Sequence, residues 1–246
     1  MYSRILISIL LILALSKHAA AQNITDSTTV KTSWKRVVLA PAVLVSAGLI
    51  AMTDNEVFDK WEIEEGRNEI APNFHTHADD YLQYLPLAVV YGLNLSGIKG
   101  EHDLANLTAL VIKSELIMTA IVFPLKKLTA VPRPDTGSPD SFPSGHTAQA
   151  FVAATILHKE YGKDHPLYSV LGYATATSVG ILRVMNDRHW ASDVLVGAGI
   201  GIFSTNLAYK THQYRWGKKH QKLSGSLILP MYNQGAYGVS MLLPIR

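Results

Sequence analysis

Six apolar segments, separated by Gly, Pro and polar residues, constrain the fold of this 246-residue chain more than any other feature. Each is rich in Ala, Leu, Ile and Val, and several are apolar on every helical face, which is typical of buried or lipid-facing helices. Gly97, Pro134 and Pro166 are among the residues that separate them. The segments are residues 37–52, 84–98, 104–125, 147–157, 167–184 and 193–209. The pattern predicts an all-α fold, a bundle of six helices.

The composition suits a bundle that is partly embedded in a membrane. Hydrophobic residues make up 48% of the chain and charged residues 17%. A membrane span needs about 20 mostly apolar residues. Segment 147–157 is shorter than that, and segment 104–125 carries Lys113 and Glu115 near its middle. The formal net charge of +3 is too small to recruit nucleic acid, so we expect no nucleic-acid partner.

The N-terminus has the three-part pattern of a cleaved secretory signal peptide. Arg4 precedes an apolar run over residues 5–15, and Ala19-Ala20-Ala21 precede Gln22. An uncleaved anchor helix is the alternative, which the shortness of the apolar run disfavours. With either interpretation the protein is exported to the cell envelope. The chain has no cysteine, so packing and not disulfides must hold its fold.

The sequence divides into four parts of different character. They are a signal peptide at 1–21, a polar segment at 22–35, a helical domain at 36–209, and a basic segment with a C-terminal β-hairpin at 210–246. The hairpin is predicted because residues 226–244 alternate apolar and polar around a Gln234-Gly235 turn.

Two polar stretches have two interpretations each. Residues 54–83 alternate charged and aromatic side chains. This pattern predicts either amphipathic helices at an interface or a solvated cap over the bundle. The cations between Lys210 and Lys222 suit an anionic membrane surface or a solvated loop. Within the first stretch, His75 and His77 with Asp79 and Asp80 are of metal-ligand type, but we interpret them as a polar interfacial loop.

Three polar clusters stand out against the apolar background, and together they suit a phosphate. They are Lys126 with Arg133-Pro134, then Pro143-Ser144-Gly145-His146, then Arg183 with His189 and Asp193. The cations supply charged donors to a phosphate without a metal. Ser144 is a natural N-cap, and behind it the amides of Gly145 and His146 can face an anion at a helix N-terminus.

The histidines supply the groups for a reaction. If the sixth helix begins near His189, its i, i+4 spacing to Asp193 places both on one face. The carboxylate then holds one imidazole nitrogen while the other attacks phosphorus. His146 on the opposite side would serve as general acid, and later as base for the water that hydrolyses a phosphohistidine.

The three clusters resemble, in order and spacing, the signature of the type 2 phosphatidic acid phosphatase family, which is shared with vanadium haloperoxidases. The resemblance covers about residues 104–209, and one departure is Leu182, where the family usually has serine. It implies a helical bundle with a site that uses no metal or other cofactor. It also implies His189 as nucleophile, Asp193 as its partner and His146 as acid. The implied phosphate ligands are Lys126, Arg133, Ser144, Gly145 and Arg183.

The predicted signal peptide, residues 74–85 and the C-terminal tail resemble those of cell-envelope members from Bacteroides-like bacteria, some of which dephosphorylate lipid A. We therefore expect a membrane-associated phosphatase whose site faces the periplasm. Its substrate would be a lipid phosphate such as phosphatidic acid, undecaprenyl pyrophosphate or lipid A. The alternatives are a broad-specificity soluble periplasmic acid phosphatase, a vanadate-dependent peroxidase and a non-catalytic phospholipid-binding protein.

Overall fold

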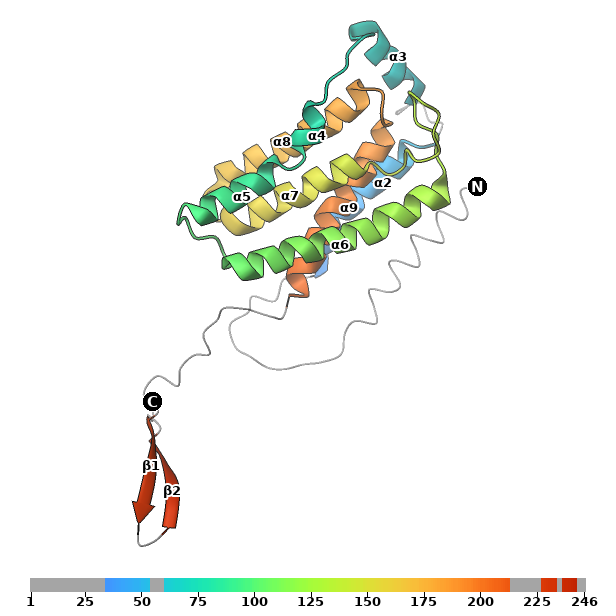
Figure 1. The fold of residues 1–246 in the computed structure, drawn as a ribbon. Helices are drawn as coiled ribbons and strands as arrows, with labels where there is room; N and C mark the ends of the chain where they lie inside the picture. Colours follow the sequence, from blue (N-terminus) through green and yellow to red (C-terminus); the bar gives the residue numbers. More distant parts are fainter. Residues whose placement is uncertain (1–33, 54–59, 213–226, 234–235, 243–246) are drawn as a thin grey trace. The chain divides into compact units, whose positions relative to one another are not determined.

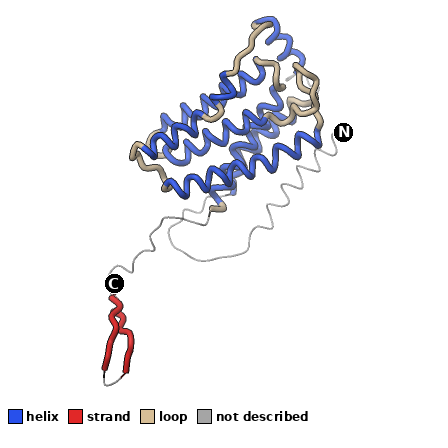
Figure 2. The backbone as a smooth tube through the Cα atoms, in the orientation of Figure 1, coloured by secondary structure: helices blue, strands red, loops and turns tan. Residues whose placement is uncertain are grey.

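A computed structural model describes residues 34–53, 60–212, 227–233 and 236–242. The predicted signal peptide lies outside the described residues. The chain divides into two compact units, residues 1–213 and 214–246. The described part of the first unit is helical, and the described part of the second consists of two strands (Figure 2).

The described residues contain eight helices where the apolar pattern predicted six, so the count of six was too low. The helices are α2 (Trp34–Ile50), α3 (Lys60–Ile70), α4 (Ala78–Leu82), α5 (Leu85–Leu95), α6 (Leu104–Thr129), α7 (Gly145–Tyr161), α8 (Pro166–Met185) and α9 (Ala191–Lys210). The predicted six correspond to α2 and α5 to α9. The additional α3 and α4 lie within residues 54–83, where short amphipathic helices were one of two interpretations.

Helix α9 is central to the bundle (Figure 1). It packs against α2, α6 and α7, while α7 also packs against α8 and α5. Apolar side chains of α6, α7 and α9, among them Leu107, Ile156 and Ile200, form the main buried core. Burial of such side chains stabilises each by about 1.5–3 kcal/mol, which is how a chain without disulfides holds its helices together.

Two glycines of α9 allow this helix to approach the first turn of α7. A Cβ added to Gly197 would stand 2.6 Å from the carbonyl oxygen of Ser144, and one added to Gly201 would stand 2.4 Å from that of Ala148. Both distances are shorter than carbon and oxygen tolerate. The close α7–α9 contact therefore depends on the missing side chains and fixes the N-terminus of α7 beside that of α9.

We predict that Gly201→Ala lowers the midpoint of thermal unfolding, because overpacking a tight contact costs about 1–3 kcal/mol. Gly92→Ala in α5 is the matched control, since no atom lies within 4 Å of its added Cβ. There the same substitution is expected to be neutral or to stabilise by about 0.5–1 kcal/mol. Equal midpoints for the two variants in detergent solution would contradict the close α7–α9 contact.

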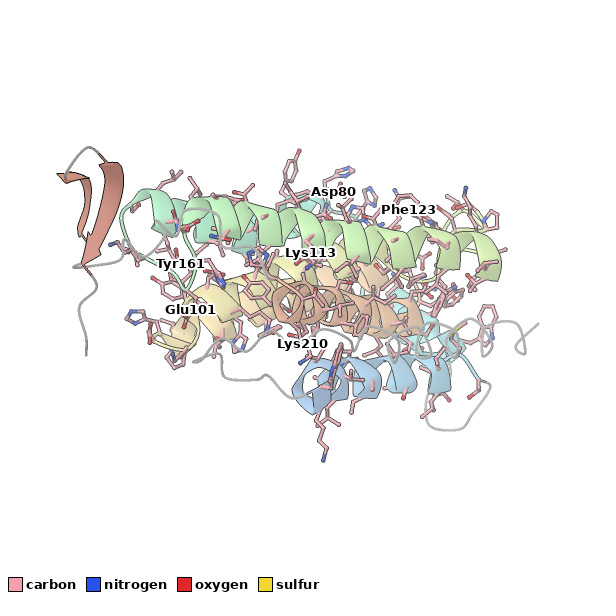
Figure 3. The ribbon with its side chains drawn as sticks, turned by 90° about the horizontal axis from the view of Figure 1, so that it is seen from below. Asp80, Glu101, Lys113, Phe123, Tyr161 and Lys210 are labelled. Carbon is pink, nitrogen blue, oxygen red and sulfur yellow. The ribbon has the colours of Figure 1, made fainter. Side chains whose placement is uncertain are left out.

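Helices α6 and α9 are long and apolar enough to cross a membrane, by length and composition alone. The apolar stretch of α9 is 61% buried within the bundle, whereas that of α6 is only 33% buried. Helix α6 exposes Ile112, Leu116 and Phe123 along its length. Phe123 is labelled in Figure 3. Of the two, α6 therefore offers the larger apolar surface to a membrane.

The second unit contains β1 (Leu227–Asn233) and β2 (Ala236–Leu242). They pair antiparallel, with Leu227 opposite Leu242 and Asn233 opposite Ala236. The expected turn at Gln234-Gly235 and most of the basic segment lie outside the described residues. The hairpin over residues 226–244 stays a prediction.

Candidate active site

The three motif clusters, which span residues 126–193, meet where α6 and α8 end and α7 and α9 begin. Lys126 at the end of α6 donates to the carbonyl oxygens of Asp140, at 2.5 Å, and Ser141, at 3.2 Å. The backbone N–H of Ser144, before α7, donates to the carbonyl oxygen of Asp193 in α9 at 3.0 Å. The structure therefore brings the second cluster into direct contact with the third, and it places the first cluster against the loop that precedes the second.

The predicted nucleophile and its partner are buried together. His189 Nδ1 lies 3.4 Å from Asp193 Oδ2, and the two residues are 3% and 0% exposed. The expectation that one helical face carries both was wrong, because α9 begins only at Ala191. His189 lies in the preceding loop, and Asp193 in the first turn accepts the backbone N–H of Trp190 at 3.1 Å. The carboxylate reaches back to the imidazole from the helix N-terminus.

Ser141 is a member of this cluster that the sequence did not reveal. Its hydroxyl donates to Asp193 Oδ2 at 2.5 Å and lies 3.4 Å from His189 Nδ1. It is fully buried. With the Trp190 N–H, it fixes the carboxylate against the imidazole. Only its position two residues before Pro143 could have indicated it.

Burial lowers the pKa of His189 to about 4, although the Asp193 carboxylate opposes that shift. The imidazole is therefore neutral at neutral pH, with an unprotonated nitrogen available for attack. Burial also lowers the pKa of His146, the Arg183 charge adds to this, and the carboxylates of Asp80 and Asp79 oppose it.

The depressed pKa of His189 predicts a loss of stability in acid. The unfolded imidazole takes up its proton near pH 6.5 and the folded one only near 4. The stability is therefore fully present above pH 6.5 and falls by roughly 3 kcal/mol as the pH drops to about 4. His189→Gln cannot titrate, so its unfolding midpoint should fall less between pH 7 and about pH 4.5 than that of the natural protein. Parallel falls would contradict a neutral buried His189.

The N-terminus of α7 has the features of an anion site. Ser144 is the N-cap, as predicted, and its hydroxyl accepts the Thr147 N–H at 3.4 Å and pairs with the Thr147 hydroxyl at 2.9 Å. No atom lies within 4 Å of a Cβ added to Gly145. Gly145 and His146 are both half-buried. The side-chain position of Gly145, in the first turn of α7, thus faces open space.

Lys126, Arg133 and Arg183 each have a hydrogen-bond partner in the protein, but one buried donor atom of Arg183 has none among the described residues. Arg133 forms two hydrogen bonds with the Asp140 carboxylate, at 2.8 and 3.1 Å. Arg183, 6% exposed, donates from Nη1 to Asp79 Oδ2 at 2.7 Å. Its Nε has no hydrogen-bond partner among the described residues. An unsatisfied buried donor costs about 1–3 kcal/mol, so this N–H is a candidate ligand for an anion.

Two carboxylates of α4 also belong to this cluster, and the sequence did not place them there. Buried Asp79 accepts from Arg183 and from Asn186 Nδ2, the latter at 3.0 Å. Asp80 Oδ1 lies 3.0 Å from His146 Nε2. The loop interpretation of residues 75–80 was therefore wrong for both carboxylates. In the described part of the chain, no group of three or more His, Cys, Asp or Glu side chains is arranged to hold a metal ion.

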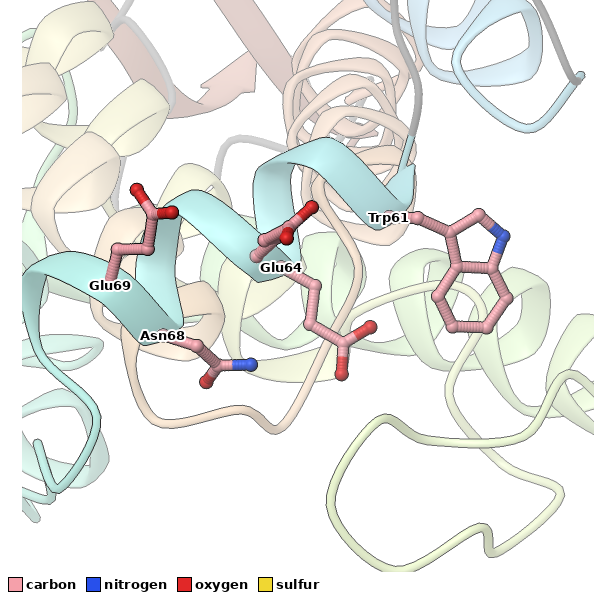
Figure 4. Close-up of a pocket in the computed structure, with 5 residues that line it drawn as sticks. Trp61, Glu64, Asn68 and Glu69 are labelled. Atoms are coloured by element: carbon pink, nitrogen blue, oxygen red, sulfur yellow. The ribbon is translucent and has the colours of Figure 1, made fainter.

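Helix α3 lies beside the loop that carries His189. The rings of Trp61 and Trp190 meet edge to face at 5.4 Å, and Arg67 Nε donates to the Met185 carbonyl oxygen at 3.0 Å. A small cavity between α3 and this loop is lined in part by Glu64 and His189. A wider hollow on α3 is lined by Trp61, Glu64, Glu65, Asn68 and Glu69 (Figure 4). Its acidic lining does not suit an anion.

Comparison with known proteins gives a family match, a relative and two solved structures. Residues 107–217 match the model of the PAP2 superfamily, and every residue predicted for the site lies in that interval. A lipid A 1-phosphatase of Porphyromonas gingivalis is 31% identical over 266 residues, which cover 94% of this chain and 58% of that protein. This chain thus spans somewhat more than half of that relative's length.

Two solved structures are also similar. The crystal structure of Aquifex aeolicus LpxE has 27% identity and a TM-score of 0.45, covering 59% of this chain and 93% of that one. The crystal structure of a transmembrane PAP2-type phosphatidylglycerolphosphate phosphatase from Bacillus subtilis has 20% identity and a TM-score of 0.47. It covers 72% of this chain and all of that one.

Proposed function

We propose, on the premise that residues 107–217 match the PAP2 superfamily, that the protein hydrolyses lipid phosphates through a phosphohistidine on His189. The observation that carries the proposal is the meeting of a buried His189–Asp193 pair, three cations and the N-terminus of α7. A neutral imidazole held by a carboxylate, next to donors for a phosphate, suits nucleophilic attack on phosphorus.

The proposed reaction has two steps. His189 Nδ1 faces Asp193 and Ser141, so Nε2 attacks phosphorus while the bond from phosphorus to the lipid oxygen breaks. His146 gives its proton to that leaving oxygen. His146 then takes a proton from water, whose oxygen displaces His189 from phosphorus and releases inorganic phosphate. Both histidines return to their starting states.

The proposed phosphate ligands are the Nε of Arg183, the first amides of α7, and the side chains of Lys126 and Arg133. Of these, the Arg183 Nε is unpaired among the described residues, and the side-chain position of Gly145 in the first turn of α7 faces open space. Lys126 and Arg133 would exchange their present acceptors for phosphate oxygens. The Ser144 hydroxyl, engaged with Thr147, supports the site as the α7 cap. Leu182 offers no hydroxyl to replace the family's usual serine.

Lipid A is the substrate that the name of the Porphyromonas gingivalis relative favours. The exposed apolar face of α6, which extends past Lys126 to Leu128, supports a substrate with acyl chains. The test is phosphate release by the detergent-purified protein from lipid A, phosphatidic acid, undecaprenyl pyrophosphate and p-nitrophenyl phosphate. Fastest release from one lipid identifies the substrate class. Release from p-nitrophenyl phosphate alone would overturn the lipid specificity, and no release from any substrate would overturn the phosphatase.

The proposed location is the cell envelope, in contact with the membrane, with the site facing the periplasm. The chain lacks cysteine, so Thr136→Cys, in the exposed loop between α6 and α7, adds a single thiol near the site. A maleimide that cannot cross the inner membrane should label it in cells with a permeabilised outer membrane. Labelling only after lysis would contradict the periplasmic orientation.

A further inference from the structure

We propose that Asp80 is a positioning residue for His146, an inference that rests on the proposed function. Its Oδ1 atom lies 3.0 Å from His146 Nε2. A carboxylate can only accept at neutral pH, so this contact keeps a proton on Nε2. The proton that His146 delivers to the leaving oxygen is then the one on Nδ1. The site would hold two histidine–carboxylate pairs, one for attack and one for protonation.

Buried neighbours hold Asp80 in this place. Helix α4 lies beside α7 and α8 (Figure 1). The preceding residue, Asp79, is 1% exposed and bonded to Arg183 and Asn186. Asn186 also accepts the backbone N–H of Thr76 and donates to its carbonyl oxygen, both at 2.9 Å. These bonds fix α4 against the end of α8 and direct Asp80 toward His146.

The charges around Asp80 and His146 suit a positioning role for Asp80. The burial of Asp80 alone would raise its pKa, but hydrogen bonds from His77 and His146 and the charges of His146 and Arg183 lower it overall. Asp80 is thus ionised at neutral pH. The charged groups facing His146 are Arg183 of α8, which disfavours its protonation, and Asp79 and Asp80 of α4, which favour it. Removal of the Asp80 charge leaves less of His146 in the acid form.

A competing role for Asp80 is also open to test. Its Oδ1 lies 3.8 Å from Arg183 Nη1 as well. The carboxylate thus stands between two groups proposed to act on the substrate. If it merely occupied the place of a phosphate oxygen, its removal would tighten substrate binding and leave protonation unchanged.

The experiment compares Asp80→Asn with the matched control Glu101→Gln in the full-length protein. Glu101 is an exposed carboxylate 3.5 Å from Lys163 and well separated from Asp80 (Figure 3). For the lipid phosphate that is hydrolysed fastest, Asp80→Asn should lower kcat by about tenfold to a hundredfold with KM unchanged. For p-nitrophenyl phosphate, whose leaving oxygen needs little protonation, kcat should fall by less than about threefold. The control should stay within about twofold on both.

Two further measurements separate positioning from a structural role. The alkaline limb of the kcat profile should move to lower pH in Asp80→Asn, because His146 loses its proton more readily. In a His146→Ala background, Asp80→Asn should have no additional effect. Equal losses on both substrates, an unshifted limb, or a lower KM with unchanged kcat would overturn the inference alone. A natural protein without phosphatase activity would overturn the proposed function, and this inference with it.

Discussion

Replacing His189 with alanine is expected to lower phosphate release from a lipid phosphate by about four orders of magnitude or more. The substitution removes the nitrogen that forms the bond to phosphorus, and no other histidine touches Asp193 in the described residues. Water would then have to attack directly, helped only by the cations and the amides of α7. The measurement is inorganic phosphate release by the detergent-purified variant over a long incubation.

The matched control is His165→Ala, which removes an exposed histidine at the start of α8. Its activity should remain within about twofold of the natural protein. The unfolding midpoint of His189→Ala must also show a folded protein, because the side chain that it removes is buried. If a folded His189→Ala variant kept more than about a tenth of the activity, the phosphohistidine mechanism would be wrong.

Replacing Asp193 with asparagine is expected to lower turnover by about two to four orders of magnitude while leaving the fold intact. Asp193 Oδ2 accepts from Ser141 and Trp190 and faces His189, whereas Oδ1 has no partner among the described residues. An asparagine can place its amide oxygen at the Oδ2 position and retain these contacts. The substitution therefore removes chiefly the charge that stabilises the imidazole during attack.

Comparison with Asp193→Ala separates the effect of the lost negative charge from the effect of the lost hydrogen bonds. It removes the acceptor for Ser141 and Trp190 as well, so it should lower stability by about 1–3 kcal/mol in addition to turnover. We expect a near-natural unfolding midpoint for Asp193→Asn and a lower one for Asp193→Ala. Activity of Asp193→Asn close to that of the natural protein would show that the negative charge is not required.

The chemistry at the helix ends could be predicted from the sequence because its motifs lie within single turns and short loops. Ser144-Gly145-His146 reads as a helix start from three adjacent residues. The family resemblance, confirmed by the match over residues 107–217, relates these motifs to the cations. The start of the helix before Asp193 could not be predicted to the residue, since Trp190 and not a small polar residue occupies the N-cap of α9.

The remaining members of the site could not be predicted because they depend on packing between distant segments. Asp79 meets Arg183, and Asp80 meets His146, only after α4 docks on α7 and α8. Helix α4 has five residues, too few for a hydrophobic period to reveal its buried face. Ser141 lies in a loop whose path is set by Lys126 and by the start of α9. Local patterns contain no information about such contacts.

The edge-to-face pair of Trp61 and Trp190 gives the protein an intrinsic fluorescent probe next to the site. Trp190 directly follows His189, and its indole N–H donates to the Pro132 carbonyl oxygen at 2.9 Å. Indole emission responds to neighbouring charge and water, so occupation of the site by phosphate or vanadate should alter the intrinsic fluorescence. Affinities for non-hydrolysed ligands then become measurable in the unlabelled protein, with Trp61→Phe to assign the signal.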